Sequence, residues 1–281
     1  MTVAEYLELS APPPLDALIH CFWFLSGPMA GAEVQSVVPD GRMEIVLHLG
    51  EPFSEVGPDG VARPQGEALL AGQLTSPFRL LPRGPADVVG IRFRSAGARS
   101  VLGFPAAEAT GRVERLSEYR PRLAGELLSA MARRPGGKEG RRQCEERVRG
   151  LAGVLSRFAG QTPPALVAEA VRWLDHAKAP PVHAVAARLG VTPRTLERRM
   201  LAETGLSPRM LSRVLRFRRA FRLIDEAPAG TWARVAHTAG YFDQAHLIRE
   251  FRRFAGAPPT AFLAAEPVLT RALLGTDQVV A

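Results

Sequence analysis

The sequence predicts an α+β protein, in which an antiparallel β-barrel or sandwich with following helices precedes an all-α domain with two helix-turn-helix units. Apolar and polar residues alternate along short segments before residue 105, apolar residues recur at helical spacing after it, and the last third of the chain contains one pattern twice. We expect a β-rich domain at 1–105, a helical segment at 106–160, the helix-turn-helix domain at 161–265 and a flexible tail at 266–281.

Period-two alternation predicts the strands of the first domain. Apolar and more polar positions interleave in two clear runs: Met43, Ile45, Leu47 and Leu49 with Arg42, Glu44, Val46 and His48, then Val89, Ile91 and Phe93 with Gly90, Arg92 and Arg94. Shorter candidates lie at 34–38, 69–70 and 78–81 between turns rich in proline and glycine. Several short strands with frequent turns favour a sandwich or a small barrel.

The polar faces of these strands have two interpretations. In one, Arg42, Glu44, His48 and Arg92 face solvent. In the other, some of them line a pocket for an anionic or polar effector, with Arg92 as the first candidate, because pockets combine apolar walls with a few polar groups. A filled interior with all four side chains in water would leave dimerisation as the purpose of the domain.

The segment 106–160 has the apolar spacing of helices. Leucines at 116, 123, 127 and 128 form one stripe, and the apolar residues from Val148 to Phe158 form another. Between them the segment 133–142 is basic and contains Pro135-Gly136-Gly137, which predicts an exposed loop. The two stripes fit either a core within one chain or a homodimer interface.

The repeated pattern has the outline of a helix-turn-helix. The first copy contains Val185, Ala186, Gly190, Leu196, Arg198, Met200, Gly205 and Pro208, and the second contains Val235, Ala236, Gly240, Leu247, Arg249, Phe251, Gly256 and Pro259. The offset is 50 residues at the turn glycines and 51 from the leucines onward. A unit this small cannot bury its own apolar face, so we expect the two copies to share a core through the segment between them.

Helix-start signals place a second, recognition helix in each copy. Thr192 is a good N-cap with Pro193 in the first turn, and Asp243 caps the second copy, whose first helix we expect to start at an N-cap Thr231. Because Arg198 follows Leu196 by about 200° around the helix, it points away from the core. The expected DNA-contacting residues are Thr192, Arg194, Thr195, Glu197 and Arg198 in the first copy and Gln244, His246 and Arg249 in the second.

These outward residues also have a simpler interpretation as a solvated helix face, and His246 as a helix-start residue beside the Asp243 cap. Their position after a capped glycine turn, in two copies, favours DNA contact. A long helix from Ser207-Pro208 to about Asp225 joins the copies, and we expect some of its arginines to meet phosphates.

Charge supports a nucleic-acid partner. The chain carries a net charge of +8, and residues 161–265 hold 16 basic and 8 acidic residues, whereas the remainder holds 20 of each. The whole excess therefore lies on the segment with the repeat, as in a phosphate-binding surface.

Other function classes receive little support. No apolar run is long enough to span a membrane, the start lacks the order of a secretory signal, and Cys21 and Cys144 form no metal-binding spacing, so we expect a cytoplasmic protein. Only His20 and His48 precede residue 160, and Cys21 beside three aromatic residues fits a buried core. We therefore expect no enzyme, cofactor or metal site. The alternative is a cupin-like enzyme, or a DNA-repair protein, fused to a DNA-binding domain.

The second copy resembles the AraC-type (AraC/XylS) family of bacterial transcription regulators. The matching residues are Ala236, Gly240-Tyr241, Asp243, Leu247, Arg249-Glu250-Phe251, Gly256, Pro259 and Phe262, with departures at Ala245 and Pro258, where the family has serine or a related residue. The resemblance implies two recognition helices that read consecutive major grooves of operator or promoter DNA, and RNA polymerase as a partner if the protein is an activator.

The N-terminal half resembles, more weakly, the cupin-like sensor domains that such regulators carry. The stretch Pro39-Asp40-Gly41-Arg42 together with Gly72-Gln73 is similar to an uncharacterised subgroup of these domains. The resemblance assigns no ligand. A small-molecule effector at the polar strand faces and a homodimer through the helical segment both stay expectations.

Overall fold

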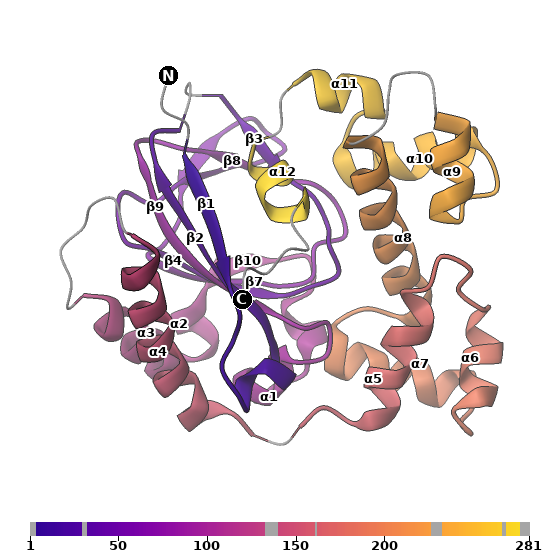
Figure 1. Cartoon of the computed structure of the whole chain (residues 1–281), viewed down its shortest axis with the longest axis horizontal. Helices are drawn as coiled ribbons and strands as arrows, with labels where there is room; N and C mark the ends of the chain where they lie inside the picture. Colours follow the sequence, from indigo (N-terminus) through magenta and orange to yellow (C-terminus); the bar gives the residue numbers. More distant parts are fainter. Residues whose placement is uncertain are drawn as a thin grey trace.

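The computed structural model describes residues 4–29, 33–132, 140–160, 162–225, 232–265 and 268–275. Thr231 and most of the loop predicted at 133–142 lie outside the described residues. A β-sandwich, flanked by helices on one side, lies beside a helical domain built from the last third of the chain (Figure 1). None of the described helices combines the length and the apolar character that crossing a membrane requires.

Two antiparallel sheets form the sandwich. The six-stranded sheet has the order β1-β2-β9-β4-β7-β10, with β1 (Glu5–Leu9), β2 (Ile19–Gly27), β4 (Glu44–His48), β7 (Ala68–Ala71), β9 (Ala86–Phe93) and β10 (Val113–Arg115). The four-stranded sheet has the order β3-β8-β5-β6, with β3 (Gln35–Val37), β5 (Ser54–Val56), β6 (Ala62–Pro64) and β8 (Phe78–Leu81). Over the described strands no ladder joins the two sheets, so the domain is a sandwich and not a closed barrel.

The strands predicted from alternation are confirmed as β3, β4, β7, β8 and β9. The boundary at residue 105 is wrong, because β10 lies within the segment predicted as helical and pairs with β7. Three residues are too few to show a period. Strand β2 shows no alternation in the sequence because both of its faces are buried. Cys21 lies on this strand and is fully buried, as predicted.

The helices after β9 cover the outer face of the six-stranded sheet. They are α1 (Ala98–Leu102), α2 (Leu116–Tyr119), α3 (Pro121–Met131) and α4 (Arg141–Phe158), and the short turns η1 (Leu15–Ala17) and η2 (Ala106–Ala109) complete this side. Leu127 and Leu151 pack in one cluster with Ile45 and Ile91 of the sheet. The apolar stripes predicted in this segment therefore form core within the chain, and they no longer support a homodimer interface.

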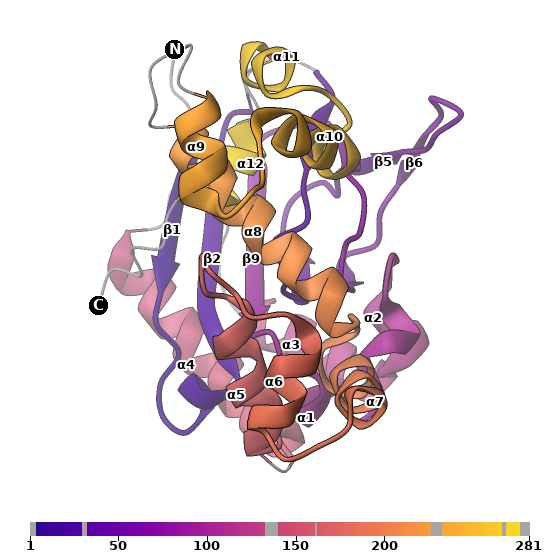
Figure 2. The same ribbon diagram turned by 90° about the vertical axis from the view of Figure 1, so that its right-hand side faces the viewer.

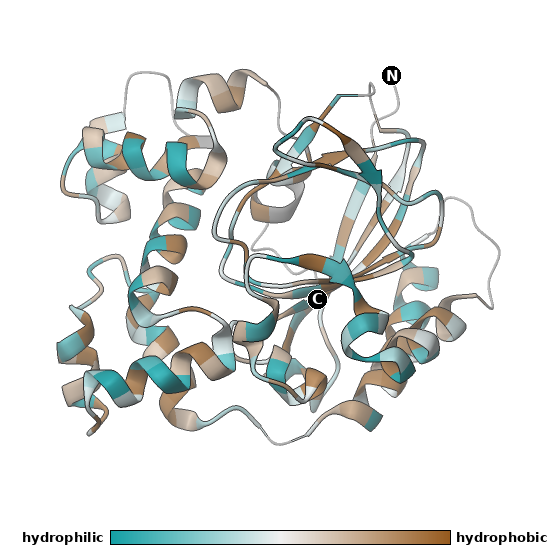
Figure 3. Ribbon diagram, turned by 180° about the vertical axis from the view of Figure 1, so that it is seen from behind, coloured by the Kyte–Doolittle hydropathy of each residue, from teal (hydrophilic) through white to brown (hydrophobic). Residues whose placement is uncertain are grey.

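The helical domain consists of α5 (Ala165–Leu174), α6 (Val182–Arg188), α7 (Pro193–Thr204), α8 (Pro208–Asp225), α9 (Trp232–Ala239), α10 (Gln244–Ala255) and α11 (Pro259–Ala264). Helix α8 runs between the two helix-turn-helix units (Figure 2). Phe217 and Phe221 on α8 meet Phe251 of α10 with ring centroids 5.2 and 6.4 Å apart. In Figure 3 hydrophilic residues recur along these helices between hydrophobic ones, as expected for helices with one buried face.

Part of the segment expected as a flexible tail is a helix, α12 (Val268–Gly275). Leu269 and Leu274 are buried, and the Thr270 hydroxyl donates a hydrogen bond to the Ser36 carbonyl of β3. The guanidinium of Arg222 on α8 donates to the Leu274 carbonyl at 3.3 Å. The prediction is wrong for these residues because apolar side chains of α12 find buried positions against distant parts of the chain. Residues 276–281 lie outside the described residues.

Candidate nucleic-acid interface and effector cavity

The first helix-turn-helix unit is α6, the turn at Gly190 and α7. Gly190 has a φ of +65°, a conformation that side-chain-bearing residues adopt at a cost. The Thr192 hydroxyl accepts a hydrogen bond from the Thr195 N–H at 3.1 Å, which caps α7 as predicted. Leu196 and Met200 are fully buried and fix the orientation of α7.

The predicted contact residues of α7 lie opposite that buried face. Thr192, Arg194, Glu197 and Arg198 are exposed, and Thr195 is half-buried. The Thr195 side chain also accepts a hydrogen bond from the Thr192 hydroxyl at 3.0 Å, so it is part of the cap. The structure thus brings two cationic side chains and one carboxylate together on the exposed N-terminal half of α7.

The second unit is α9, the turn at Gly240 and α10. A Cβ at Gly240, which has a φ of +90°, would lie 2.3 Å from the Ala177 carbonyl oxygen. The Asp243 carboxylate accepts a hydrogen bond from the His246 N–H at 2.6 Å, as predicted for an N-cap. Leu247 is fully buried on the opposite side of the helix.

The three predicted contact residues of α10 have different environments. Gln244 and Arg249 are exposed. The His246 ring is half-buried and packs edge-on against the Tyr241 ring, with centroids 5.1 Å apart. Its position is therefore compatible both with the helix-start interpretation and with a contact at the edge of the helix.

One exposed aromatic residue was missed by the sequence analysis. Phe242, directly before the Asp243 cap, is 92% exposed. Its neighbour Tyr241 is buried, and burial raises the pKa of the Tyr241 hydroxyl. Two consecutive aromatic residues in a turn do not reveal which side chain faces inward, so the sequence alone could not identify Phe242.

Five arginines of α8 bind within the protein, and for them the expected phosphate contacts are not supported: Arg213, Arg216, Arg218, Arg219 and Arg222. Arg209 on the same helix is exposed, and its phosphate contact stays a prediction. Arg213 and Arg216 both pair with Glu250 of α10, the second at 3.2 Å. Arg218 pairs with Asp175 at 2.9 Å, and Arg219 donates to the Asp175 carbonyl at 2.6 Å. These contacts hold α5 and α10 to the connecting helix.

In the first domain, a cavity of about 80 Å³ lies between the two sheets. Glu44 and His48 line it together with Trp23 and Phe53, and Leu269 of α12 forms another part of the wall. His48 is 4% exposed and Arg92 only 1%. The solvent-facing interpretation is therefore wrong for Glu44, His48 and Arg92.

The guanidinium of Arg92 is held by carboxylates of its own sheet. Its Nη1 lies 2.9 Å from Glu8 and its Nε 2.5 Å from Glu44. Burial raises the pKa of the Glu44 carboxyl, although the Arg92 charge opposes this shift. This pairing does not favour the interpretation that Arg92 binds an anionic effector. Arg42 lies apart from the cavity, in a hollow that it borders with Arg94 and Arg218.

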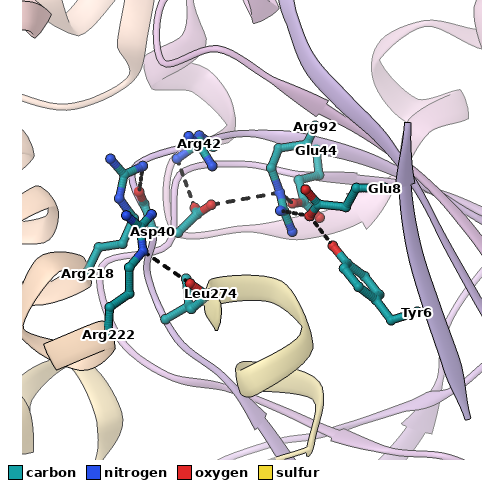
Figure 4. A network of polar contacts seen from close by, with 9 residues as sticks. All are labelled: Tyr6, Glu8, Asp40, Arg42, Glu44, Arg92, Arg218, Arg222 and Leu274. Atoms are coloured by element: carbon teal, nitrogen blue, oxygen red, sulfur yellow. Dashed lines mark hydrogen bonds and ion pairs between the residues drawn. The ribbon is translucent and has the colours of Figure 1, made fainter. Parts of the chain in front are cut away.

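The two motifs of the first domain singled out in the sequence lie against the helical domain. The Asp40 carbonyl accepts a hydrogen bond from Arg218 at 3.4 Å (Figure 4). A Cβ at Gly41, whose φ is +83°, would lie 3.2 Å from side chains of α8. At the second motif, a Cβ at Gly205, the residue that ends α7, would lie 3.1 Å from Gln73.

A second polar link joins the first recognition helix to the first domain. The Thr110 hydroxyl donates to the Gly205 carbonyl at 2.7 Å. Arg99 of α1 pairs with Glu203 of α7 at 2.5 Å. The C-terminal end of α7 is therefore fixed to the sandwich domain, while its N-terminal half is exposed.

The structure also brings together Glu8, His20 and Cys21, whose ligand atoms lie within 4.8 Å of one another. This cluster was not predicted, because Glu8 lies on β1, a strand without clear alternation in the sequence. Burial raises the pKa of the Cys21 thiol to about 12. Because Arg92 already pairs with Glu8, its positive charge disfavours a cation at this place.

Comparison with known proteins finds one matching family model in each half of the chain. Residues 185–265 match a family model described as a helix-turn-helix domain, and residues 7–115 match a domain of unknown function (DUF6597). No curated protein gives a match to the chain. The solved DNA-binding domain of AdpA, a global transcriptional factor, in complex with a target DNA is 32% identical, with 38% of this chain and 94% of that chain covered and a TM-score of 0.33.

Solved structures of ToxT from Vibrio cholerae match over a longer range at low identity. One at 1.65 Å is 11% identical, covers 86% of this chain and 98% of that chain, and has a TM-score of 0.47. Wild-type ToxT of strain SCE256 with a bound unsaturated fatty acid is 12% identical, covers 86% and 94%, and has a TM-score of 0.49. The family model over the repeat and the identity to the AdpA domain confirm the resemblance seen in the sequence, and the chain belongs to the AraC-type family of DNA-binding transcription regulators.

Proposed function

We propose that this regulator reads specific DNA with α7 and α10 in consecutive major grooves, under the control of a small molecule that binds between its two sheets. The observation that supports the first part is the pair of capped recognition helices with exposed N-terminal halves. The N-terminal residues of such helices contact base edges. The AdpA domain, 32% identical, is solved with its target DNA.

The connecting helix fixes the two units relative to each other. An α-helix of 18 residues is about 27 Å long, which is close to the roughly 34 Å of one DNA turn. Both units are held to the middle of α8, where Arg213 pairs with Glu250 of α10 and Arg218 pairs with Asp175 at the end of α5. Two recognition helices on such a rigid connector fit successive major grooves on one face of the duplex.

Control by an effector is supported by the position of the cavity. The strand β4 that carries Glu44 and His48 follows the loop at Asp40, which contacts α8. A ligand that moves β4 also moves the loop at Asp40, and so alters the contact between this loop and α8 of the DNA-binding domain. Linkage then requires that DNA shifts the affinity for the ligand by the same factor.

The test is fluorescence anisotropy with labelled DNA from upstream of the protein's own gene and with a scrambled duplex of equal length. We expect tighter binding to the first, with an affinity that falls steeply with salt because phosphate contacts release counterions. Equal affinity for both duplexes, or turnover of a substrate without DNA binding, would contradict the proposal.

A further inference from the structure

The buried faces of the two recognition helices match residue by residue. All four buried residues of α7 have buried counterparts in α10: Leu196, Met200, Glu203 and Thr204 in α7, and Leu247, Phe251, Phe254 and Ala255 in α10. Each counterpart follows 51 positions later in the sequence. Because an α-helix turns by about 100° per residue, this equal spacing gives both helices the same orientation toward the core of their own unit. A residue of α7 and the residue 51 positions after it therefore occupy equivalent places.

The outward face of α7 is centred on two arginines. Arg194 precedes the buried Leu196 by two residues and Arg198 follows it by two, so each points within about 20° of the direction opposite Leu196. Both arginines are exposed, and within the described part of the chain neither forms a hydrogen bond or an ion pair. They lie about 6 Å apart along the helix axis. Both guanidinium groups are therefore available, side by side, for contacts in a groove.

Only one of these two arginines has an arginine as its counterpart in α10. Arg198 corresponds to Arg249, which is exposed and forms no hydrogen bond or ion pair with any residue that the structure describes. Arg194 corresponds to Ala245, which is also exposed. The first position of the outward face thus carries a guanidinium in α7 and a single methyl group in α10. The two faces differ in chemistry although they have the same orientation.

A guanidinium and a methyl group recognise different bases. The guanidinium donates two parallel hydrogen bonds to O6 and N7 of guanine, whereas the methyl group packs against the C5-methyl group of thymine. Side chains in the N-terminal half of a recognition helix contact base edges, and the four residues hold the second and sixth positions of their helices. Their separation of about 6 Å is less than two base-pair steps of about 3.4 Å. The two contacts of each helix therefore belong to one short half-site.

We propose that the two half-sites of the DNA target differ in sequence. Two guanines face α7, at Arg194 and Arg198, whereas a thymine and a guanine face α10, at Ala245 and Arg249. This inference rests on the proposed DNA-binding function and names the bases that the regulator recognises. The protein then binds its target in one orientation, because exchanged half-sites would place the Arg194 guanidinium at a thymine and a guanine opposite the Ala245 methyl group.

The experiment selects binding sites for the full-length protein from a library of duplexes with randomised bases and sequences the bound DNA. The unaltered protein should select two half-sites about one helical turn apart, one with two guanines and the other with a thymine and a guanine. Arg194→Ala should remove the preference for one guanine in the first half-site only. Ala245→Arg should replace the thymine of the second half-site by guanine. Each change should alter the affinity for the base concerned by roughly 5- to 150-fold.

Arg199→Ala is the matched control on the same helix. Arg199 is also exposed, but it follows Leu196 by three residues, which places it at the flank of α7 and away from the centre of the outward face. Its removal should weaken binding to all selected duplexes alike, as the loss of a phosphate contact does, and leave the selected bases unchanged. Anisotropy titrations with the selected duplexes measure these affinities.

Two half-sites of the same composition would overturn the proposal. So would an unchanged base preference in either Arg194→Ala or Ala245→Arg, with melting midpoints showing that both variants are folded. Failure of the proposed function gives a different result, because the unaltered protein would then select no sequence at all, and both proposals would fall together.

Discussion

The carbonyl oxygen of Asp40 accepts a hydrogen bond from Arg218 Nη1 at 3.4 Å, across the boundary between the sandwich and the helix that connects the two DNA-binding units. The carboxylate of the same Asp40 lies 4.0 Å from Arg92 Nε. Figure 4 shows how this one residue lies between the buried ion pairs of the sandwich and α8. Asp40 therefore contacts both the ion pairs beside the cavity and α8 of the DNA-binding domain.

Arg198→Ala should weaken binding to the specific DNA site by roughly 1–3 kcal/mol and relax the preference at one base position. Arg198 is exposed on α7 opposite the buried Leu196. Anisotropy titrations against the specific and the scrambled duplex measure both effects. Arg122→Ala removes an equal charge from α3, at a side chain 87% exposed, and serves as the control. Equal losses on both duplexes would show that Arg198 contacts only phosphate.

Phe251→Ala should destabilise the helical domain by roughly 3–5 kcal/mol, as large-to-small changes in a core do. The Phe251 ring is fully buried, with the Phe217 and Phe262 centroids 5.2 and 5.7 Å away. Urea unfolding followed by circular dichroism measures the change. An unaltered unfolding midpoint would show that Phe251 does not occupy this core.

Phe242→Ala should leave stability unchanged and weaken DNA binding by about 1 kcal/mol, the value for partial burial of a large apolar side chain. Phe242 is 92% exposed and directly precedes α10, where a ring can contact a thymine methyl group or a sugar. The same anisotropy and unfolding measurements apply. Full affinity in this variant would place Phe242 outside the interface.

Gly240→Ala should cost more stability than Gly190→Ala, although both glycines have positive φ. The left-handed conformation costs each alanine about 1–2 kcal/mol. At Gly190 a Cβ meets nothing within 4 Å, whereas at Gly240 it would lie 2.3 Å from the Ala177 carbonyl oxygen. Unfolding free energies of the two variants isolate the clash, because the backbone cost is shared. Equal losses of unfolding free energy in the two variants would mean that the backbone at Ala177 shifts to relieve the clash at no cost.

His48→Phe should flatten the acid side of the stability profile. Because burial lowers the pKa of His48 from 6.5, the unfolded chain takes up a proton below pH 6.5 that the folded protein resists. The contribution of neutral His48 to the free energy of unfolding is thus fully present above pH 6.5. It falls as the pH drops below that value, by up to about 1.4 kcal/mol per pH unit. Unfolding free energies between pH 5 and 7 measure the slope. The same slope in both proteins would contradict a neutral, buried His48.

The sequence predicted the helical domain in detail because its signals are local. Glycine turns, the Thr192 and Asp243 caps and the apolar spacing all lie within one unit. The sandwich was predicted only in part. The polar residues of its inner face find their partners only in the folded chain, where Arg92 contacts Glu8, 84 residues earlier in the sequence. Strand β1, which carries Glu8, has no clear alternation. The cavity depends on pairing between strands and on Leu269, so no local pattern could reveal it.

The place of Leu269 in the wall has a consequence for biosynthesis. Synthesis proceeds from the N-terminus, and domains fold largely as they emerge. Every strand of the sandwich precedes residue 116, whereas α12 begins at Val268. While the ribosome is still translating the DNA-binding domain, the cavity lacks the wall that Leu269 supplies. Until α12 emerges, this part of the cavity wall is therefore open to solvent in the nascent chain.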